Sequence, residues 1–282
     1  MTLMHENIGL RKTYKAYIRK VINLVQKLCG RYLVSIILFG SAKVGGLSPL
    51  SDIDIVIVVD DTTPQSVLKK ADLILFFYET KNNLWINNSN FFSLIVKTLN
   101  ILTGMYKSHF ICRYRDLKEM IFHKIFNTSY IMSKILAPKC LVLRNFLITA
   151  KTIYGRDVLQ SIKKRVSEFE NCGYISLLKS LFMNLLLSLG ALVISPFFDE
   201  AYKYSVEAIK WSMYGVLTFC KYIDISIKKA LSVFYNCISK KFLALFIEAK
   251  YKAQKNARFI TLAPFYVILI HTALRKIKLS KC

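Results

Sequence analysis

Residues 36–59 read IILFGSAKVGGLSPLSDIDIVIVV, and this stretch decides the fold. Two apolar runs flank a loop rich in glycine, serine and proline, which predicts one strand over residues 33–39 and another over residues 52–59. Side chains alternate faces along a strand, so Asp52 and Asp54 point the same way, roughly 6 to 7 Å apart along the strand axis. Two carboxylates so placed repel each other unless a cation lies between them, and hard oxygen ligands suit Mg²⁺. The stretch therefore predicts a site for a metal-bound nucleotide.

The surrounding sequence predicts an α+β fold. The expected elements outside residues 33–59 are a helix over 7–29, a helix over 65–79, a helix over 91–102 and a strand over 108–114. Beyond about residue 160 the apolar residues follow helical spacing, and no alternating strand pattern appears. We therefore expect a mixed-sheet domain with an N-terminal helix at residues 1–159, followed by an all-helical domain at residues 160–282.

The chain is strongly basic, with a formal net charge of +24. The charge is spread evenly, because residues 1–159 hold 22 Lys and Arg against 10 acids and residues 160–282 hold 19 against 7. Such an excess predicts attraction to phosphate, whether on a nucleotide, a nucleic acid or an anionic membrane. The densest basic stretch, residues 250–258, has two interpretations: a nucleic-acid contact or a solvated helix face.

Cysteine usage and the N-terminus bear on the compartment. The seven cysteines form no CxxC pair and no zinc-ligand spacing, and their odd number and scatter predict reduced, mostly buried thiols. Residues 1–15 contain no apolar core of a secretory signal. Together these features predict a cytoplasmic protein.

One uncharged run, residues 180–198, is long enough to cross a bilayer. It contains Asn184 and ends near Pro196, and charged residues follow at once, which favours a buried core helix over a membrane span. A membrane is therefore not expected among the partners.

The motif at residues 39–55 resembles the pattern of the polymerase-beta-type nucleotidyltransferase superfamily. That pattern is an apolar residue, glycine, then glycine or serine, a gap of about nine to thirteen residues, and two acids separated by one apolar residue. Phe39, Gly40 and Ser41, the ten-residue gap, and Asp52 with Asp54 fit every position. The resemblance implies a nucleotidyltransferase domain over the first 159 residues.

The resemblance also implies roles for the motif residues. Asp52 and Asp54 would hold Mg²⁺, as one ion or two and with Mn²⁺ as the alternative ion, and would act in catalysis. The nucleotide would contact the Gly40 backbone and the Ser41 hydroxyl, with Lys43 and Ser51 as further candidates. Lys43 also has a second interpretation as a solvated loop lysine.

The superfamily normally supplies a third carboxylate from a neighbouring strand, and the candidate strand at residues 108–114 contains none. His109 falls where that carboxylate is expected, so it is a candidate catalytic residue that could bind metal or accept a proton. The alternative is a histidine that merely caps the strand. Asp116 would take the role only if the strand boundary lies several residues away.

The resemblance implies transfer of a nucleoside monophosphate from an NTP to a hydroxyl acceptor. The positive charge favours RNA or another polyanion as that acceptor. The alternative function is a fold relative without turnover that binds RNA or protein as a regulatory module. In the helical half, Tyr202–Tyr204 with Trp211 could form an acceptor face, or could belong to an amphipathic helix whose Trp211 lies in the core.

Overall fold

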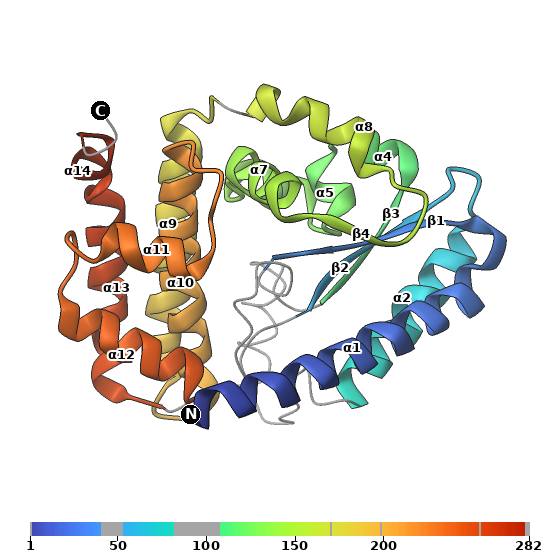
Figure 1. Cartoon of the computed structure of the whole chain (residues 1–282). Helices are drawn as coiled ribbons and strands as arrows, with labels where there is room; N and C mark the ends of the chain where they lie inside the picture. Colours follow the sequence, from blue (N-terminus) through green and yellow to red (C-terminus); the bar gives the residue numbers. More distant parts are fainter. Residues whose placement is uncertain are drawn as a thin grey trace.

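The computed structural model describes residues 2–40, 53–81, 108–169, 171–197, 199–253 and 255–279. The predicted helix over residues 91–102 lies outside these ranges. The fold is α+β, as predicted: a mixed four-stranded sheet with helices, followed by a mostly helical region (Figure 1).

The sheet has the strand order β3-β2-β1-β4. Its strands are β1 (Leu33–Phe39), β2 (Asp54–Val59), β3 (His109–Arg113) and β4 (Lys151–Gly155). β1 is antiparallel to both of its neighbours, β2 and β4, whereas β2 and β3 are parallel. The two central strands are the apolar runs of the opening stretch, since β-branched residues covered on both faces favour this position.

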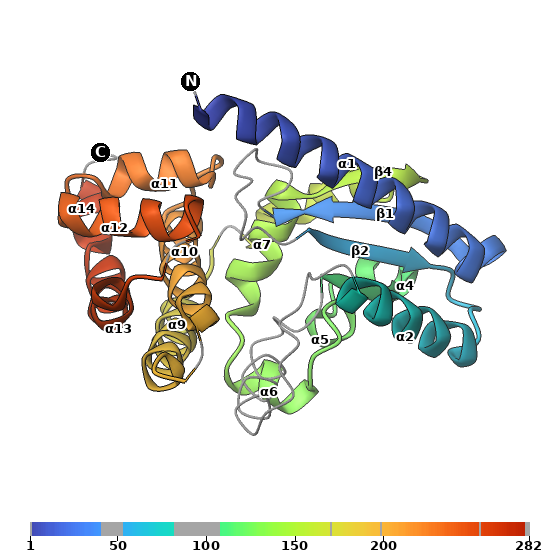
Figure 2. The same ribbon diagram turned by 90° about the horizontal axis from the view of Figure 1, so that it is seen from below.

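Helices cover both faces of the sheet (Figures 1 and 2). One face packs against α1 (Thr2–Cys29) and α2 (Gln65–Lys81), through a core that includes Val25, Leu75 and Ile55. The opposite face is covered by shorter helices, among them α4 (Tyr114–Lys118), α5 (Phe122–Ile125), α7 (Lys139–Thr149) and α8 (Leu159–Lys163). The described part of this half also contains the 3₁₀ helix η1 (Gly30–Tyr32), α6 (Tyr130–Ile135) and the 3₁₀ helix η3 (Lys164–Phe169).

The second half is built around α10, which lies at its centre. Its elements are α9 (Tyr174–Ile194), the 3₁₀ helix η4 (Asp199–Ala201), α10 (Tyr202–Phe219), α11 (Ile227–Phe234), α12 (Lys240–Tyr251), α13 (Ala257–Thr272) and α14 (Leu274–Leu279). α9 and α13 pack on α10 and on each other. The predicted boundary between residues 159 and 160 falls within α8 and stays a prediction.

α7 contacts both halves. Leu143, Phe146 and Leu147 lie in the core against the sheet, while Leu141 lies in the core of the helical half. The buried Arg144 reaches across and donates a hydrogen bond of 2.6 Å to the Thr218 carbonyl at the end of α10. This helix therefore couples the sheet to the helical half.

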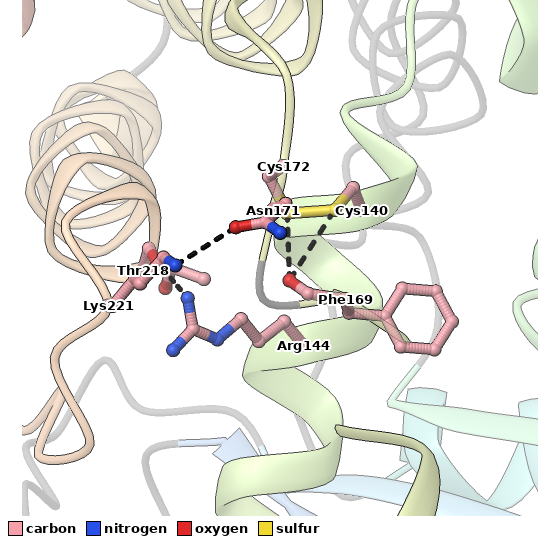
Figure 3. The surroundings of a disulfide bond; sticks show 7 residues. All are labelled: Cys140, Arg144, Phe169, Asn171, Cys172, Thr218 and Lys221. Atoms are coloured by element: carbon pink, nitrogen blue, oxygen red, sulfur yellow. Dashed lines mark hydrogen bonds between the residues drawn. A yellow bond between two sulfur atoms is a disulfide. The ribbon is translucent and has the colours of Figure 1, made fainter. Parts of the chain in front are cut away.

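The prediction that all cysteines are reduced is wrong for one pair. Cys140 at the start of α7 forms a disulfide with Cys172, just before α9, and both sulfur atoms lie near the Phe169 carbonyl (Figure 3). The sequence separation of 32 residues gave no spacing signal, because only the packing of α7 against the start of α9 brings the two thiols together. Cys29, Cys112 and Cys220 are buried thiols outside the disulfide, as predicted.

Candidate active site

Gly40 and Asp54 meet where β1 ends and β2 begins. Phe39 pairs with Asp54 in the antiparallel ladder, so the Asp54 side chain projects on the same face of the sheet as Phe39. Gly40 has φ +72°, and a Cβ atom added to it would lie 2.6 Å from Oδ2 of Asp54. A side chain here would be strained by the left-handed backbone, and its Cβ would force the Asp54 carboxylate to move. The glycine of the motif therefore leaves the carboxylate directly against bare backbone.

Thr149 at the end of α7 holds this turn in place. The Gly40 amide donates a hydrogen bond of 3.2 Å to the Thr149 hydroxyl, which in turn donates one of 2.9 Å to the Asn145 carbonyl. Thr149 is buried, so the contact is shielded from water. Sequence reasoning missed this residue, because a threonine 109 positions from Gly40 carries no spacing signal.

Four other predicted site residues lie outside the described residues: Ser41, Lys43, Ser51 and Asp52. Their predicted roles stay predictions. Of the proposed carboxylate pair, the structure describes Asp54.

His109 is not brought to the face where Asp54 lies. It pairs with Ile55 in the parallel ladder, and Ile55 faces the core beneath α1 and α2. Adjacent strand residues point to opposite faces, so His109 lies behind the sheet relative to Asp54. The position does not support direct proton transfer by His109 in a site at Asp54.

His109 instead bridges two carboxylates of α2. Its Nδ1 lies 2.8 Å from Oε1 of the buried Glu79, and its Nε2 lies 3.2 Å from Oδ1 of Asp72. Burial by itself lowers the pKa of His109, but the hydrogen bonds and charges of Asp72 and Glu79 outweigh it and raise the pKa above its ordinary value. The two carboxylates therefore favour the protonated ring, and the ring ties α2 to β3.

Asp116 lies at the other end of the sheet from Asp54. It follows β3 in α4, and the residue pair Val59 and Arg113 marks that end of the parallel ladder. Five residue rises along a strand separate the two ends by roughly 16 Å. Asp116 forms an ion pair with Lys124 at 3.1 Å, and it does not substitute for the missing third carboxylate.

The geometry around Asp54 fits a metal-triphosphate site in one respect. The side-chain-free Gly40 lets phosphate oxygens approach the backbone beside a carboxylate, and carboxylate oxygens are preferred ligands of Mg²⁺. Within the described ranges there is no cluster of three or more His, Cys, Asp or Glu side chains that could hold a metal by itself. A metal here would depend on Asp52 and on the substrate for further ligands.

The proposed acceptor face in α10 is mostly internal. Tyr202 and Tyr204 are buried in the helical core, and Glu207 accepts a hydrogen bond of 3.1 Å from the Trp211 indole and pairs with the buried Lys210. This burial does not support an acceptor face, and it fits the alternative only in part, because α10 has no exposed residue and Trp211 is partly buried against the core. The basic stretch at residues 250–258 does not present all its lysines to solvent as free charges. Lys250 is buried, and Lys252 pairs with Glu248.

Comparisons with known proteins agree with this architecture. Residues 18–103 match a family described as "Nucleotidyltransferase domain". Among solved structures, the chain resembles that of spectinomycin adenyltransferase AAD(9) from Enterococcus faecialis with ATP and spectinomycin, with TM-score 0.53 and 13% sequence identity over 92% of this chain and 98% of that one. No curated protein sequence matches the chain. The resemblance to the polymerase-beta-type nucleotidyltransferase superfamily is thereby confirmed.

Proposed function

We propose that this chain, which carries a nucleotidyltransferase domain, is an enzyme that transfers a nucleoside monophosphate from an NTP to a hydroxyl group. The observation that carries the proposal is the approach of Gly40 to Asp54, with 2.6 Å between a Cβ added at residue 40 and the carboxylate. The carboxylate offers an anionic ligand for a cation, and the absence of a side chain at residue 40 lets phosphate oxygens approach the backbone beside it.

In the proposed reaction, the acceptor oxygen forms a bond to the α-phosphorus of the NTP. The bond from that phosphorus to the oxygen bridging to the β-phosphorus breaks, and pyrophosphate leaves with the electron pair. The hydroxyl proton is released. The chain contributes by binding and orienting the triphosphate, through the Gly40 backbone and, as proposed from the sequence, through Ser41, Lys43 and Ser51.

Asp54 and Asp52 would hold one or two Mg²⁺ ions, with Mn²⁺ as the alternative ion. The metal, when bound, neutralises negative charge on the triphosphate. Thr149 positions the turn that carries Gly40, so it supports this site without touching the substrate in the proposed arrangement.

For the acceptor we propose RNA or another polyanion, because the chain carries a net charge of +24. A cationic acceptor would favour an acidic pocket instead. For the location we propose the cytoplasm, where NTPs and RNA are both at hand.

The test compares Asp54→Asn with the wild-type chain and with Glu248→Gln, a matched loss of one negative charge on the exposed side of α12. We expect pyrophosphate release in the presence of Mg²⁺, NTP and RNA to fall by roughly 100-fold or more in Asp54→Asn, because a metal ligand contributes several kcal/mol to the transition state. Glu248→Gln should retain wild-type activity.

Two outcomes would contradict the proposal. Equal activity of Asp54→Asn and wild type would show that Asp54 has no role in the reaction. NTP binding by wild type without pyrophosphate release across RNA and other acceptor pools would favour the regulatory module.

A further inference from the structure

α9 presents a line of apolar side chains to solvent. The line consists of Ile175, Leu178, Phe182, Leu186, Leu189 and Val193, and each is between 41% and 71% exposed. Their spacing of three or four residues places them on one side of the helix, along roughly 27 Å of its length. We call these six residues the outer face of α9. Contiguous exposed apolar surface of this length marks an interaction site more often than a random feature of a monomer.

The opposite side of α9 is fixed inside the protein. Ser180, Asn184 and Ser188 are buried, and Asn184 donates a hydrogen bond of 3.3 Å to the Ser180 hydroxyl. Ser180 also lies against Gly215 of α10, since a Cβ added to Gly215 would meet its hydroxyl at 2.7 Å. By length and composition α9 and the segment Ala257–Ile277 could each cross a membrane. The polar, packed side of α9 instead favours a helix that lies along a surface.

α13, which packs against α9, has exposed apolar and basic residues of its own. The two helices lie side by side (Figure 2). The exposed residues of α13 include Phe265 and Ile268. The same helical spacing continues to Arg258 at one end and to Arg275 and Lys276 at the other, and all three are exposed. Neither α9 nor the segment from Ala257 to Leu279 contains an aspartate or glutamate.

The positive charge of this surface favours one kind of binding partner over another. A second copy of the chain would bring the same basic residues together, and nothing acidic in these two helices would offset their repulsion. A bilayer with anionic headgroups offers the complement: lipid chains for the apolar line and negative charge for Arg258, Arg275 and Lys276. We propose that the outer face of α9, together with α13, binds the surface of an anionic lipid bilayer.

This inference departs from the sequence-based expectation that a membrane is not a partner. The buried core helix predicted for residues 180–198 corresponds to α9, which is buried on one side and exposed on the other. Binding at this surface is independent of the proposed transfer reaction, because none of its residues lies in the sheet that carries Asp54.

The experiment measures flotation of the full chain with vesicles of phosphatidylcholine alone and of phosphatidylcholine with phosphatidylglycerol. We expect binding only to the anionic vesicles. The variant Ile175→Ser/Phe182→Ser/Val193→Ser should lose more than about tenfold in affinity. The matched control Leu73→Ser/Phe77→Ser removes apolar residues that are 54% and 61% exposed on α2, and it should bind as wild type does.

A second set of variants tests the charge. Arg258→Ser/Arg275→Ser/Lys276→Ser should weaken binding to anionic vesicles by about tenfold or more, since each basic residue near the surface contributes to the attraction. The control Arg19→Ser/Lys20→Ser/Lys27→Ser removes the same charge from exposed positions of α1 and should bind as wild type does.

Three results would overturn the proposal. One is equal binding to both kinds of vesicle, and another is an equal loss in each variant and its control. The third is a dimer in light scattering that the α9 variant converts to a monomer, without vesicle binding by wild type. Circular dichroism of every variant reports on the folded state, and NTP binding reports separately on the proposed function.

Discussion

At the residue scale, the absence of a side chain at Gly40 is what allows the Asp54 carboxylate to lie so close to residue 40. The motif needs glycine for two separate reasons: the backbone there has φ +72°, and a Cβ would lie 2.6 Å from the carboxylate. The first reason concerns backbone strain and the second concerns the site. Gly30 allows the two reasons to be tested separately. It also has a positive φ, +50°, but nothing lies within 4 Å of a Cβ added there.

We therefore predict different outcomes for two alanine substitutions. Gly30→Ala should lower the free energy of unfolding by about 1 to 2 kcal/mol, the cost of a left-handed conformation with a side chain, and leave NTP binding unchanged. Gly40→Ala should cost at least as much and should also weaken NTP binding by more than about tenfold, because Asp54 must move. Urea unfolding and calorimetric titration with a non-hydrolysable NTP check both. Unchanged NTP binding in Gly40→Ala would show that the close approach has no part in the site.

At the element scale, the contact between α2 and β3 depends on a charged histidine. His109 lies between Glu79 and Asp72, and its raised pKa means that the native state keeps a proton that the unfolded chain releases. This stabilisation is fully present below the ordinary pKa of 6.5 and is lost as the pH rises through the folded-state value. The attachment of α2 should consequently weaken in alkaline solution.

The corresponding prediction concerns His109→Gln. At pH 6 the substitution should lower the free energy of unfolding by about 1.5 to 3 kcal/mol, the range for hydrogen bonds to charged groups, and the difference from wild type should shrink as the pH rises. Urea unfolding from pH 5.5 upward measures this difference. His123→Gln is the control, since the His123 ring packs against Tyr130. A difference that stays constant or grows with pH would mean that His109 is neutral in the folded chain.

His109→Asp distinguishes the two roles discussed for this residue. A third carboxylate beside Asp72 and Glu79 would be buried without a counter-charge, so we expect destabilisation of about 3 to 5 kcal/mol and no gain of turnover. Thermal unfolding and pyrophosphate release measure these two effects. Increased turnover in a folded variant would instead return His109 to the catalytic site.

At the scale of the whole molecule, the Cys140–Cys172 disulfide and the bridge from Arg144 to the Thr218 carbonyl join α7 to the helical half (Figure 3). The other end of α7 carries Thr149, which holds Gly40. α7 thus connects the helical half to the turn at Gly40. A cytoplasmic location stays a prediction, and in that reducing compartment the bond would be open.

Reduction of this bond should therefore be measurable. Chain entropy for a sequence separation of 32 residues predicts a loss of about 3 to 4 kcal/mol in the free energy of unfolding on adding dithiothreitol. Cys140→Ser/Cys172→Ser should match the reduced wild type and should not respond to the reductant, while Cys237→Ser should respond as wild type does. A wild-type chain indifferent to reductant would show that the bond does not form in solution.

The sequence by itself determined the features that depend on neighbours along the chain. Strand alternation, the glycine turn and the placement of Asp54 on the second strand follow from residues 33–59, because backbone sterics and the two-residue period act locally. The helical second half followed in the same way from its spacing. The family resemblance rests on these local features as well.

Only the tertiary structure decided the features that depend on pairing and packing between distant segments. The register of β3 against β2 turned His109 to the far face of the sheet, because a shift of one residue exchanges the faces. Contacts across more than 30 residues in sequence brought Thr149 to Gly40 and Cys172 to Cys140. The outer face of α9 could likewise be identified only from the structure, which shows that α10 packs against the opposite side. Hydropathy alone does not tell which side of an apolar helix is buried.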